Sequence, residues 1–310
     1  MPFFLGIDGG GTKTRCVIGD ETSVLATGSG SGCNVVRVGE ACARDSLAAA
    51  IHEACVQAGV SPQKISRTCA GLAGAADDGV ASLVQRVLIE IVGGAIEVIG
   101  DMEIALESAF GGGPGVITIA GTGAIAYGRN NRGESARAGG WGRLVSDEGS
   151  GYWIGAQAIG AALRRYDGGK KSQLLDELMS ALEVRSVHDL AVKANSDPVP
   201  EFARLFPVVL EAEKSGDMAA TEVLERAGTE LAATAEIVIG RLFLELESVL
   251  VATHGGVFTG SALVKEAFRA ELTRLCPEAK CIDVAVNPML GALQRARREF
   301  GIWHKQGTSQ

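Results

Sequence analysis

Residues 3–14, FFLGIDGGGTKT, and residues 116–127, VITIAGTGAIAY, follow one pattern. In each stretch a short apolar run rich in β-forming residues enters a turn of glycine and threonine, and a second apolar run leaves it. Such a pattern predicts a strand, a tight turn and an antiparallel strand. Because the same device occurs twice, we expect two related lobes that face one cleft.

The sequence around the first stretch predicts an α/β lobe. In chain order we expect a strand over 23–27, a flexible glycine-rich loop over 28–34, a helix over 39–58, a strand over 67–71, a helix over 79–92 and a strand over 97–100. Together with the first hairpin, these elements give the order β-β-β-α-β-α-β, which is typical of an α/β arrangement.

The second half opens with the second hairpin and then becomes mostly helical. We expect a turn at 130–133, helices over about 147–166, 170–181, 200–215 and 217–246, a strand over 248–253, a closing helix over 288–300 and a frayed tail at 305–310. The glycine-rich loop at 111–115 is the expected hinge. We therefore predict an N-terminal lobe over 1–115, completed by the C-terminal helix 288–304, and a C-terminal lobe over 116–287 with helical insertions.

Composition narrows the class of protein. The chain has 310 residues and a formal charge of −8, with Lys and Arg largely scattered, so we expect no nucleic-acid partner. It has no uncharged apolar run of about 18 residues, and a strand pattern starts directly at the N-terminus, so we expect a cytoplasmic protein with no membrane partner. The seven cysteines show neither a C-x-x-C pair nor zinc-finger spacing, which predicts mostly buried thiols in a reducing compartment.

The first glycine-rich turn has the composition of a phosphate-binding site. Its three glycines carry no Cβ atoms that would block a phosphate, and their backbone N–H groups can form an anion-binding nest. The aspartate at the strand end would repel phosphate unless Mg²⁺ stands between them, so Asp8 is the predicted metal ligand. The alternative is a plain Asp-Gly hairpin turn. The cofactor-binding residues predicted here are Asp8, Gly9, Gly10, Gly11, Thr12 and Lys13.

Two better-known phosphate motifs do not fit the chain. A Walker A motif needs glycine directly before Lys-Ser/Thr and a helix after it, whereas Thr12 precedes Lys13 and a strand pattern follows. Residues 121–126 match a relaxed dinucleotide fingerprint, but an extended run follows them instead of a helix. We therefore do not expect a Rossmann-type site.

Several motifs occur in the order seen in the actin-like superfamily of sugar kinases, Hsp70 proteins and actin. They are the turn 8–14, Gly100-Asp101, Gly121-Thr122-Gly123, Gly139-Gly140-Trp141-Gly142 with the block 146–153, and Gly255-Gly256 with Gly260-Ser261. Within this superfamily the chain resembles the BadF/BadG/BcrA/BcrD ATPase family, in particular its N-acetylglucosamine kinase branch, over nearly its whole length. The resemblance implies a two-lobed actin-like ATPase fold of duplicated ribonuclease H-like domains, with a nucleotide cleft between the lobes.

The resemblance also implies ATP and Mg²⁺ as cofactors, and a catalytic carboxylate at Asp101. A carboxylate at a strand end can accept the proton of a sugar hydroxyl as its oxygen attacks the γ-phosphorus. The alternative role of Asp101 is the N-cap of a helix that begins at Met102. The implied second phosphate loop and adenosine loop comprise Gly121, Thr122, Gly123, Gly255, Gly256, Gly260 and Ser261.

By the same resemblance the partner is a small-molecule amino sugar, and the protein is a homodimer. The implied substrate-binding residues are Asn34, Asp101, Thr122, Gly140, Trp141, Asp147 and Gly151. Asp147 has an alternative role as a helix cap, and packing is the favoured role for Trp141 and Trp153. N-acetylglucosamine, phosphorylated at O6, is the expected substrate. Ala124-Ile125 stand where vertebrate-type enzymes have Ser-Asn, and the segment 69–74 has no Ser where those enzymes have Ser-Leu-Ser-Gly. These departures leave glucosamine, N-acetylmuramic acid or another hexose open.

Two other functions compete with a sugar kinase. Some relatives hydrolyse ATP to drive an electron into a 2-hydroxyacyl-CoA dehydratase or benzoyl-CoA reductase, and they share a [4Fe–4S] cluster across a dimer. That role needs suitably placed thiolates, and no cysteine occurs between Cys69 and Cys276. A non-catalytic sugar sensor of the ROK type would carry a DNA-binding head and a cysteine-rich zinc motif, and the sequence shows neither.

Overall fold

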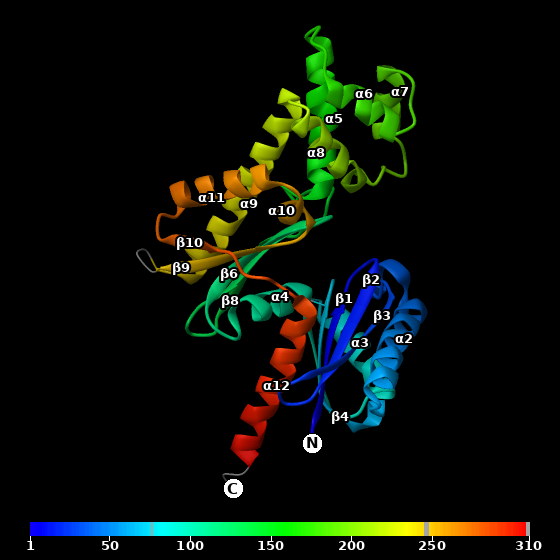
Figure 1. Ribbon diagram of the computed structural model, residues 1–310, viewed down its shortest axis with the longest axis vertical. Coiled ribbons are helices and arrows are strands. Elements are labelled where there is room, and N and C mark those ends of the chain that lie inside the picture. Colours follow the sequence, from blue (N-terminus) through cyan, green and yellow to red (C-terminus); the bar gives the residue numbers. More distant parts are fainter. Residues whose placement is uncertain (76, 245–247, 308–310) are drawn as a thin grey trace. The chain divides into compact units, whose positions relative to one another are not determined.

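The computed structural model describes residues 1–75, 77–244 and 248–307 (Figure 1). The chain divides into two compact units. Unit 1 comprises Met1–Gly113 together with the C-terminal segment from Val284 onward, and unit 2 comprises Pro114–Asp283. Each unit contains one five-stranded sheet and is described separately.

The sheet of unit 1 combines an antiparallel meander with two parallel strands. Its strand order is β3-β2-β1-β4-β5, in which β4 and β5 run parallel to β1. Asp8 on β1 therefore lies opposite Arg15 across the hairpin and opposite Gly71 on β4. The strands are β1 (Phe3–Gly9), β2 (Lys13–Gly19), β3 (Val24–Ser31), β4 (Ile65–Leu72) and β5 (Ala95–Gly100).

Helices cover both faces of this sheet. Alternate residues of β1 point to opposite faces, and both faces carry apolar side chains that need to be buried. Leu5 and Ile7 are buried with helices α2 (Glu40–Ala58) and α3 (Asp78–Ile91), whereas Phe4 is buried with α4 (Asp101–Phe110) and α12 (Pro288–Gly307). Figure 1 shows α2 and α12 on opposite sides of β1. Two short elements, α1 (Val35–Val38) and the 3₁₀ turn η1 (Pro62–Lys64), complete the unit.

The prediction of a flexible loop over 28–34 is wrong for its first half, because residues 28–31 continue strand β3. A Cβ atom built on Gly28 would lie 2.0 Å from the carbonyl oxygen of Ala50, and one on Gly30 would lie 2.4 Å from that of Ser46. Both carbonyls belong to α2. These glycines therefore allow the backbone of α2 to approach the strand closely, and they do not mark flexibility.

Unit 2 repeats the sheet of unit 1. Its order, β10-β9-β6-β7-β8, again joins an antiparallel meander, β6-β7-β8, to two strands that run parallel to the first. The expected duplication and two-lobed α/β fold are thus confirmed. The strands are β6 (Gly115–Ala120), β7 (Ala124–Arg129), β8 (Ser135–Gly139), β9 (Val249–His254) and β10 (Ala279–Ile282).

The helices of unit 2 pack around α9 and one large apolar core. A Cβ atom on Gly228 of α9 would lie 2.5 Å from the carbonyl oxygen of Val264, so glycine permits a close crossing with α11. The helices are α5 (Gly151–Asp167), α6 (Gln173–Ala181), α7 (Val187–Ala194), the 3₁₀ turn η2 (Phe202–Leu205), α8 (Phe206–Lys214), α9 (Met218–Leu242), α10 (Gly256–Gly260) and α11 (Ala262–Leu275).

Several predicted boundaries need correction. The first helix of unit 2 starts four residues later than expected, at Gly151, and the segment predicted as a helix from 200 begins as η2. The helix predicted over 217–246 ends at Leu242, and its positions 245–246 lie outside the described residues. Residues 305–307 of the predicted frayed tail belong to α12, whereas 308–310 lie outside the described residues.

None of the helices in the described part of the chain combines the length and apolar character that a bilayer crossing requires. Four cysteines, Cys16, Cys33, Cys55 and Cys69, are buried free thiols, as expected for small core residues. Cys42 is an exposed exception.

Candidate functional site

The predicted phosphate turn between β1 and β2 is fixed by backbone hydrogen bonds. Within the turn, the N–H of Gly10 donates to the carbonyl of Lys13 at 2.9 Å. The N–H of Cys33 donates to the carbonyl of Gly10 at 3.0 Å, and the N–H of Ala73 donates to that of Gly9 at 2.9 Å. The turn is thus held between the segment that follows β3 and the segment that follows β4.

The glycines of this turn have different structural roles. A Cβ atom on Gly9 would lie 2.1 Å from Cδ2 of Leu72, so packing alone requires glycine there. A Cβ atom on Gly10 would meet nothing closer than 3.7 Å. None of the three glycines has a left-handed φ, and the N–H of Gly10 is used within the turn. The N–H of Gly10 is therefore engaged within the turn, and phosphate binding by the turn stays a prediction.

Two carboxylates lie near the same edge of the sheet of unit 1. Asp8 is the last residue but one of β1, and Asp101 directly follows β5, which runs in the same direction. Burial raises the pKa of Asp8; Arg15 opposes this effect, and the negative charge of Asp101 adds to it. Burial also raises the pKa of Asp101. The two carboxylates are therefore close enough to interact, and both are poorly solvated as anions.

Asp101 does not have the capping role that we considered as its alternative. Gly100 is the N-cap of α4, and Asp101 is the first residue of the helix. Oε1 of Glu103 accepts a hydrogen bond from the N–H of Gly100 at 3.1 Å, while Oδ1 of Asp101 accepts one from its neighbour Met102 at 3.0 Å. Glu103, at the third position of the helix, thus accepts the N–H of the N-cap residue, as the glutamate of a capping box does.

Asn34 lies beside these loops. It is the N-cap of α1, and its Oδ1 accepts a hydrogen bond from the N–H of Arg37 at 3.3 Å. A Cβ atom on Gly74 would lie 3.9 Å from Nδ2 of Asn34, so the segment after β4 runs alongside it. Strand β3 runs parallel to β1, so Asn34, which follows it, lies toward the edge that carries Asp8.

In unit 2 the turn Gly121–Gly123 contacts the start of α5. The N–H of Gly151 donates to the carbonyl of Gly121 at 2.8 Å. A Cβ atom on Gly123 would lie 2.8 Å from Oδ2 of Asp147, so glycine is required for the carboxylate to lie against the turn. Thr122 at the centre of the turn is exposed. The structure therefore brings together Thr122, Asp147 and Gly151, three of the predicted sugar ligands.

The geometry of Asp147 is unusual in two ways. Its φ is 67°, in the left-handed region that non-glycine residues seldom adopt. Its side chain is buried, and Oδ1 has no hydrogen-bond partner among the described residues. Burial raises the pKa of this carboxyl group, although hydrogen bonds from the amides of Ala124 and Gly142 oppose the effect. A strained backbone and an unsatisfied buried oxygen are features that cluster at functional sites.

Asp147 is not a helix cap, because α5 begins at Gly151 and Oγ of Ser150 accepts the capping hydrogen bond from the N–H of Trp153 at 3.2 Å. Packing is confirmed for Trp153, which contacts the main core. The predicted packing role is wrong for Trp141, which is 67% exposed. The guanidinium carbon of Arg137 lies over its ring, 4.3 Å from the ring centroid. Gly140, its neighbour, has a left-handed φ of 69°.

The predicted adenosine loop follows β9. Gly255 has a φ of 106°, and a Cβ atom there would lie 2.3 Å from the carbonyl of Ala120, whereas one on Gly256 would meet nothing within 4 Å. Gly260 packs against Phe206. Ser261 is buried, and its Oγ caps α11 by accepting a hydrogen bond from the N–H of Val264 at 3.2 Å. Gly260 and Ser261 therefore have structural roles, and their part in nucleotide binding stays a prediction.

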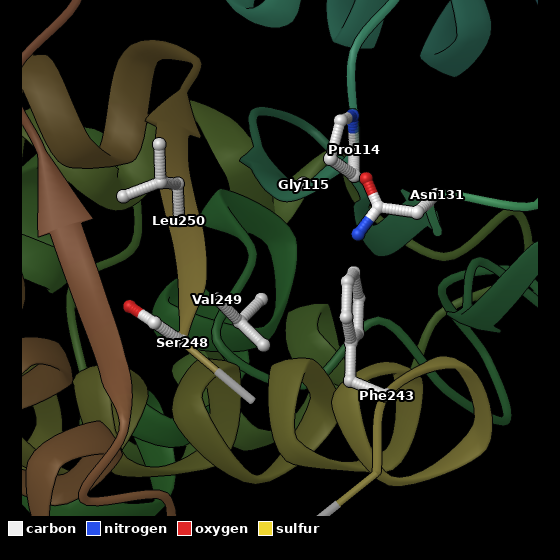
Figure 2. A pocket seen from close by; sticks show the side chains of 7 residues that line it. All are labelled: Pro114, Gly115, Asn131, Phe243, Ser248, Val249 and Leu250. Carbon is white, nitrogen blue, oxygen red and sulfur yellow. The ribbon is translucent and has the colours of Figure 1, made fainter. Parts of the chain in front are cut away.

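A separate pocket of about 320 Å³ lies elsewhere in unit 2 (Figure 2). Gly115 and Val249 in its wall begin β6 and β9, whereas the predicted nucleotide loops follow the ends of those strands. This pocket is therefore at the opposite edge of the sheet from the predicted site. Its lining consists of Pro114, Gly115, Asn131, Phe243, Ser248, Val249 and Leu250.

Two sheets of equivalent strand order, each with a glycine turn between the first two strands of its meander, have the topology of the two-lobed actin-like ATPase class. Sequence comparison identifies the branch of that class. The profile of the BadF/BadG/BcrA/BcrD ATPase family matches residues 5–296, and the chain belongs to this family. Membership of an ATPase family implies that the protein uses ATP. The predicted family is thereby confirmed.

Similar proteins include two sugar kinases. The N-acetylmuramic acid/N-acetylglucosamine kinase of Clostridium acetobutylicum is 34% identical, with 96% of this chain and 99% of the relative covered. The N-acetyl-D-glucosamine kinase of Dictyostelium discoideum is 30% identical, with 93% and 96% covered. The solved structure of a candidate N-acetylglucosamine kinase from Chromobacterium violaceum has a TM-score of 0.75 and 26% identity, with 94% and 98% covered.

Proposed function

We propose that this protein is an ATP- and Mg²⁺-dependent kinase that phosphorylates an amino sugar, most readily N-acetylglucosamine at O6. The observation that carries the proposal is the buried, unpartnered Oδ1 of Asp147 beside the turn Gly121–Gly123. A sugar hydroxyl is a donor of the kind this oxygen lacks. Relatives that match nearly the whole chain and are named as amino-sugar kinases support the same reaction.

In this proposal Asp101 is the general base. Its burial raises the pKa of the carboxyl group, which brings it closer to the working pH than an exposed aspartate would be. Asp101 would orient the acceptor hydroxyl and take its proton as the oxygen attacks the γ-phosphorus. No covalent intermediate on the protein is required.

Each unit has glycine-rich loops that we assign to nucleotide binding. Asp8 fits a cation, because burial and the nearby Asp101 disfavour its bare negative charge. Within the described ranges, no group of three or more His, Cys, Asp and Glu side chains is placed to hold a metal ion by itself, so ATP phosphates would complete the set. Mg²⁺, when bound, would neutralise charge on the transferred phosphoryl group. The open positions Gly10 and Gly256 leave room for phosphate and adenosine.

The sugar would be bound by a set of polar groups, with Trp141 as an exposed aromatic surface. Asn34 offers an amide that can bridge hydroxyls, and Thr122 and Asp147 offer a donor and an acceptor. Gly140 and Gly151 would contribute backbone groups. N-acetylmuramic acid and glucosamine are the alternative substrates. We further propose a homodimer in the cytoplasm, in line with the family resemblance.

The test is a substrate panel. Purified protein is incubated with Mg-ATP and N-acetylglucosamine, glucosamine, N-acetylmuramic acid, N-acetylmannosamine or glucose, and ADP and sugar-phosphate mass are measured together. Matched ADP and product with an amino sugar would support the proposal, and NMR of the product would locate the phosphate. ADP without sugar-phosphate would contradict it and favour an ATPase that acts on another partner. A parallel reaction with EDTA, restored by Mg²⁺, tests the metal requirement.

A further inference from the structure

Arg37 presents a guanidinium group to the first phosphate turn. A Cβ atom built on Gly11 would lie 3.1 Å from Nη1 and 3.4 Å from Cδ of Arg37. The side chain of Arg37 therefore passes directly over a residue that has no side chain of its own. This contact joins two segments of unit 1 that strands β2 and β3 separate in the sequence.

The backbone of Arg37 is fixed to the predicted sugar ligand Asn34. Its N–H donates to the carbonyl oxygen of Asn34 at 2.9 Å and also to Oδ1 of Asn34 at 3.3 Å. Cys33, the residue before Asn34, donates its N–H to the carbonyl oxygen of Gly10. Asn34, the backbone of Arg37 and the glycine turn are thus linked by hydrogen bonds, so the backbone position from which the Arg37 side chain extends follows from the fold of this segment.

The charge of Arg37 has no acidic partner among the residues that the structure describes. Some arginines of unit 1 are ion-paired instead: Arg44 pairs with Glu90, and Arg295 with Glu97. Arg37 is exposed, so its five N–H donors are available to a ligand. A guanidinium matches the geometry of a carboxylate or a phosphate, because two parallel N–H groups can bind two oxygens.

We propose that Arg37 binds an oxyanion of a substrate in the phosphoryl transfer, a role that rests on the proposed kinase function. Two sources of that oxyanion fit a guanidinium that lies beside Gly11, on a residue whose backbone is bonded to Asn34. One is a carboxylate on the sugar, such as the lactyl carboxylate of N-acetylmuramic acid, and the other is the terminal phosphate of ATP. In the first case Arg37 extends the acceptor range to acidic amino sugars; in the second it assists Lys13.

The test compares Arg37→Met and Arg37→Lys with Arg86→Met. Arg86 is an exposed arginine on α3, so its variant controls for the loss of one surface charge. Steady-state constants are measured with neutral N-acetylglucosamine and with anionic N-acetylmuramic acid. Mg-ATP binding without sugar is measured by titration calorimetry. Thermal melting shows whether each variant is folded.

A carboxylate ligand predicts that Arg37→Met raises KM for N-acetylmuramic acid by roughly 10- to 100-fold while KM for N-acetylglucosamine changes less than about 2-fold. A phosphate ligand predicts weaker ATP binding by about 10-fold, independent of the sugar. Arg37→Lys should recover part of either loss. Folded Arg37→Met with both KM values and ATP affinity like those of Arg86→Met would overturn the proposal. If the unaltered protein phosphorylates no sugar, the kinase function fails, while the calorimetric arm still tests Arg37.

Discussion

Replacing Asp101 with asparagine isolates the chemistry of its carboxylate from its place in the fold. Asparagine has nearly the same shape and keeps an oxygen that can accept the hydrogen bond from the N–H of Met102. It cannot accept a proton from a sugar hydroxyl at neutral pH. We therefore expect Asp101→Asn to bind ATP almost normally and to turn over slowly.

The expected loss follows from the role of a general base. Removing such a group lowers turnover by about 10²- to 10⁴-fold, which corresponds to about 2.7–5.4 kcal/mol of activation free energy. The stability of the folded variant should not fall along with its turnover. Because burial raises the pKa of Asp101, its charged form costs the folded state free energy at neutral pH, and asparagine removes that cost. We expect an unfolding temperature that is unchanged or higher.

The assay is coupled ADP release with saturating sugar and ATP, and Glu103→Gln is the matched control. Glu103 lies in the same helical turn, and glutamine keeps the acceptor for the N–H of Gly100. Its turnover should stay within about 2-fold of the parent. In the parent, kcat/KM should fall as pH drops through the pKa of Asp101, at a midpoint above the ordinary value of 3.8. The assignment would be refuted if Asp101→Asn retained about a third of the parent turnover. It would also be refuted if the turnover of Glu103→Gln fell as far as that of Asp101→Asn.

Three further changes test other parts of the structure. Asp147→Asn, which tolerates a left-handed backbone, should raise the sugar KM about 10-fold in steady-state assays and leave the calorimetric ATP affinity unchanged. Glu97→Gln, which removes a half-buried ion pair with α12, should lower the free energy of unfolding by about 2–3 kcal/mol in urea at pH 7, against under about 0.5 kcal/mol for the exposed control Lys214→Met. Burial alone would raise the pKa of Glu97, but its arginine partners lower it below the usual 4.5, so this difference should vanish as pH falls through that lowered pKa. Gly255→Ala should lower the melting temperature because its φ is 106°, whereas Gly256→Ala should melt normally and weaken ATP binding.

The sequence was most informative where the apolar pattern was strong. Both hairpins and the duplicated order were predictable because β-rich runs flank each glycine turn. Strands 135–139 and 279–282 were missed because they have only five and four residues, with little contrast between apolar and polar positions. Helix α11 was also missed, although Val264, Phe268 and Leu272 repeat every four residues after the cap at Ser261 and gave a usable signal.

The candidate site was predictable in residue type and not in geometry. The positions of Asp8 and Asp101 follow from strand ends, which a pattern can locate. The left-handed backbone of Asp147 cannot be read from its neighbours, because it depends on how the segment before α5 packs against Gly123. Arg37 belongs to none of the sequence motifs. Its proposed role rests on the position of its side chain beside Gly11 of the glycine turn, which the sequence does not reveal.

The last helix has a consequence for synthesis of the chain. Ala292, Leu293 and Ala296 of α12 share a buried cluster with Phe4 of β1 and Ile104 of α4. Unit 1 thus begins with β1, before unit 2 in the chain, and lacks part of its core until α12, which follows unit 2, has been translated. Unit 2 is continuous over Pro114–Asp283, so its full sequence is available earlier. Because domains generally fold as units during translation, the unit that starts second can finish first, and one face of the nascent N-terminal sheet is covered by α4 without α12 until then.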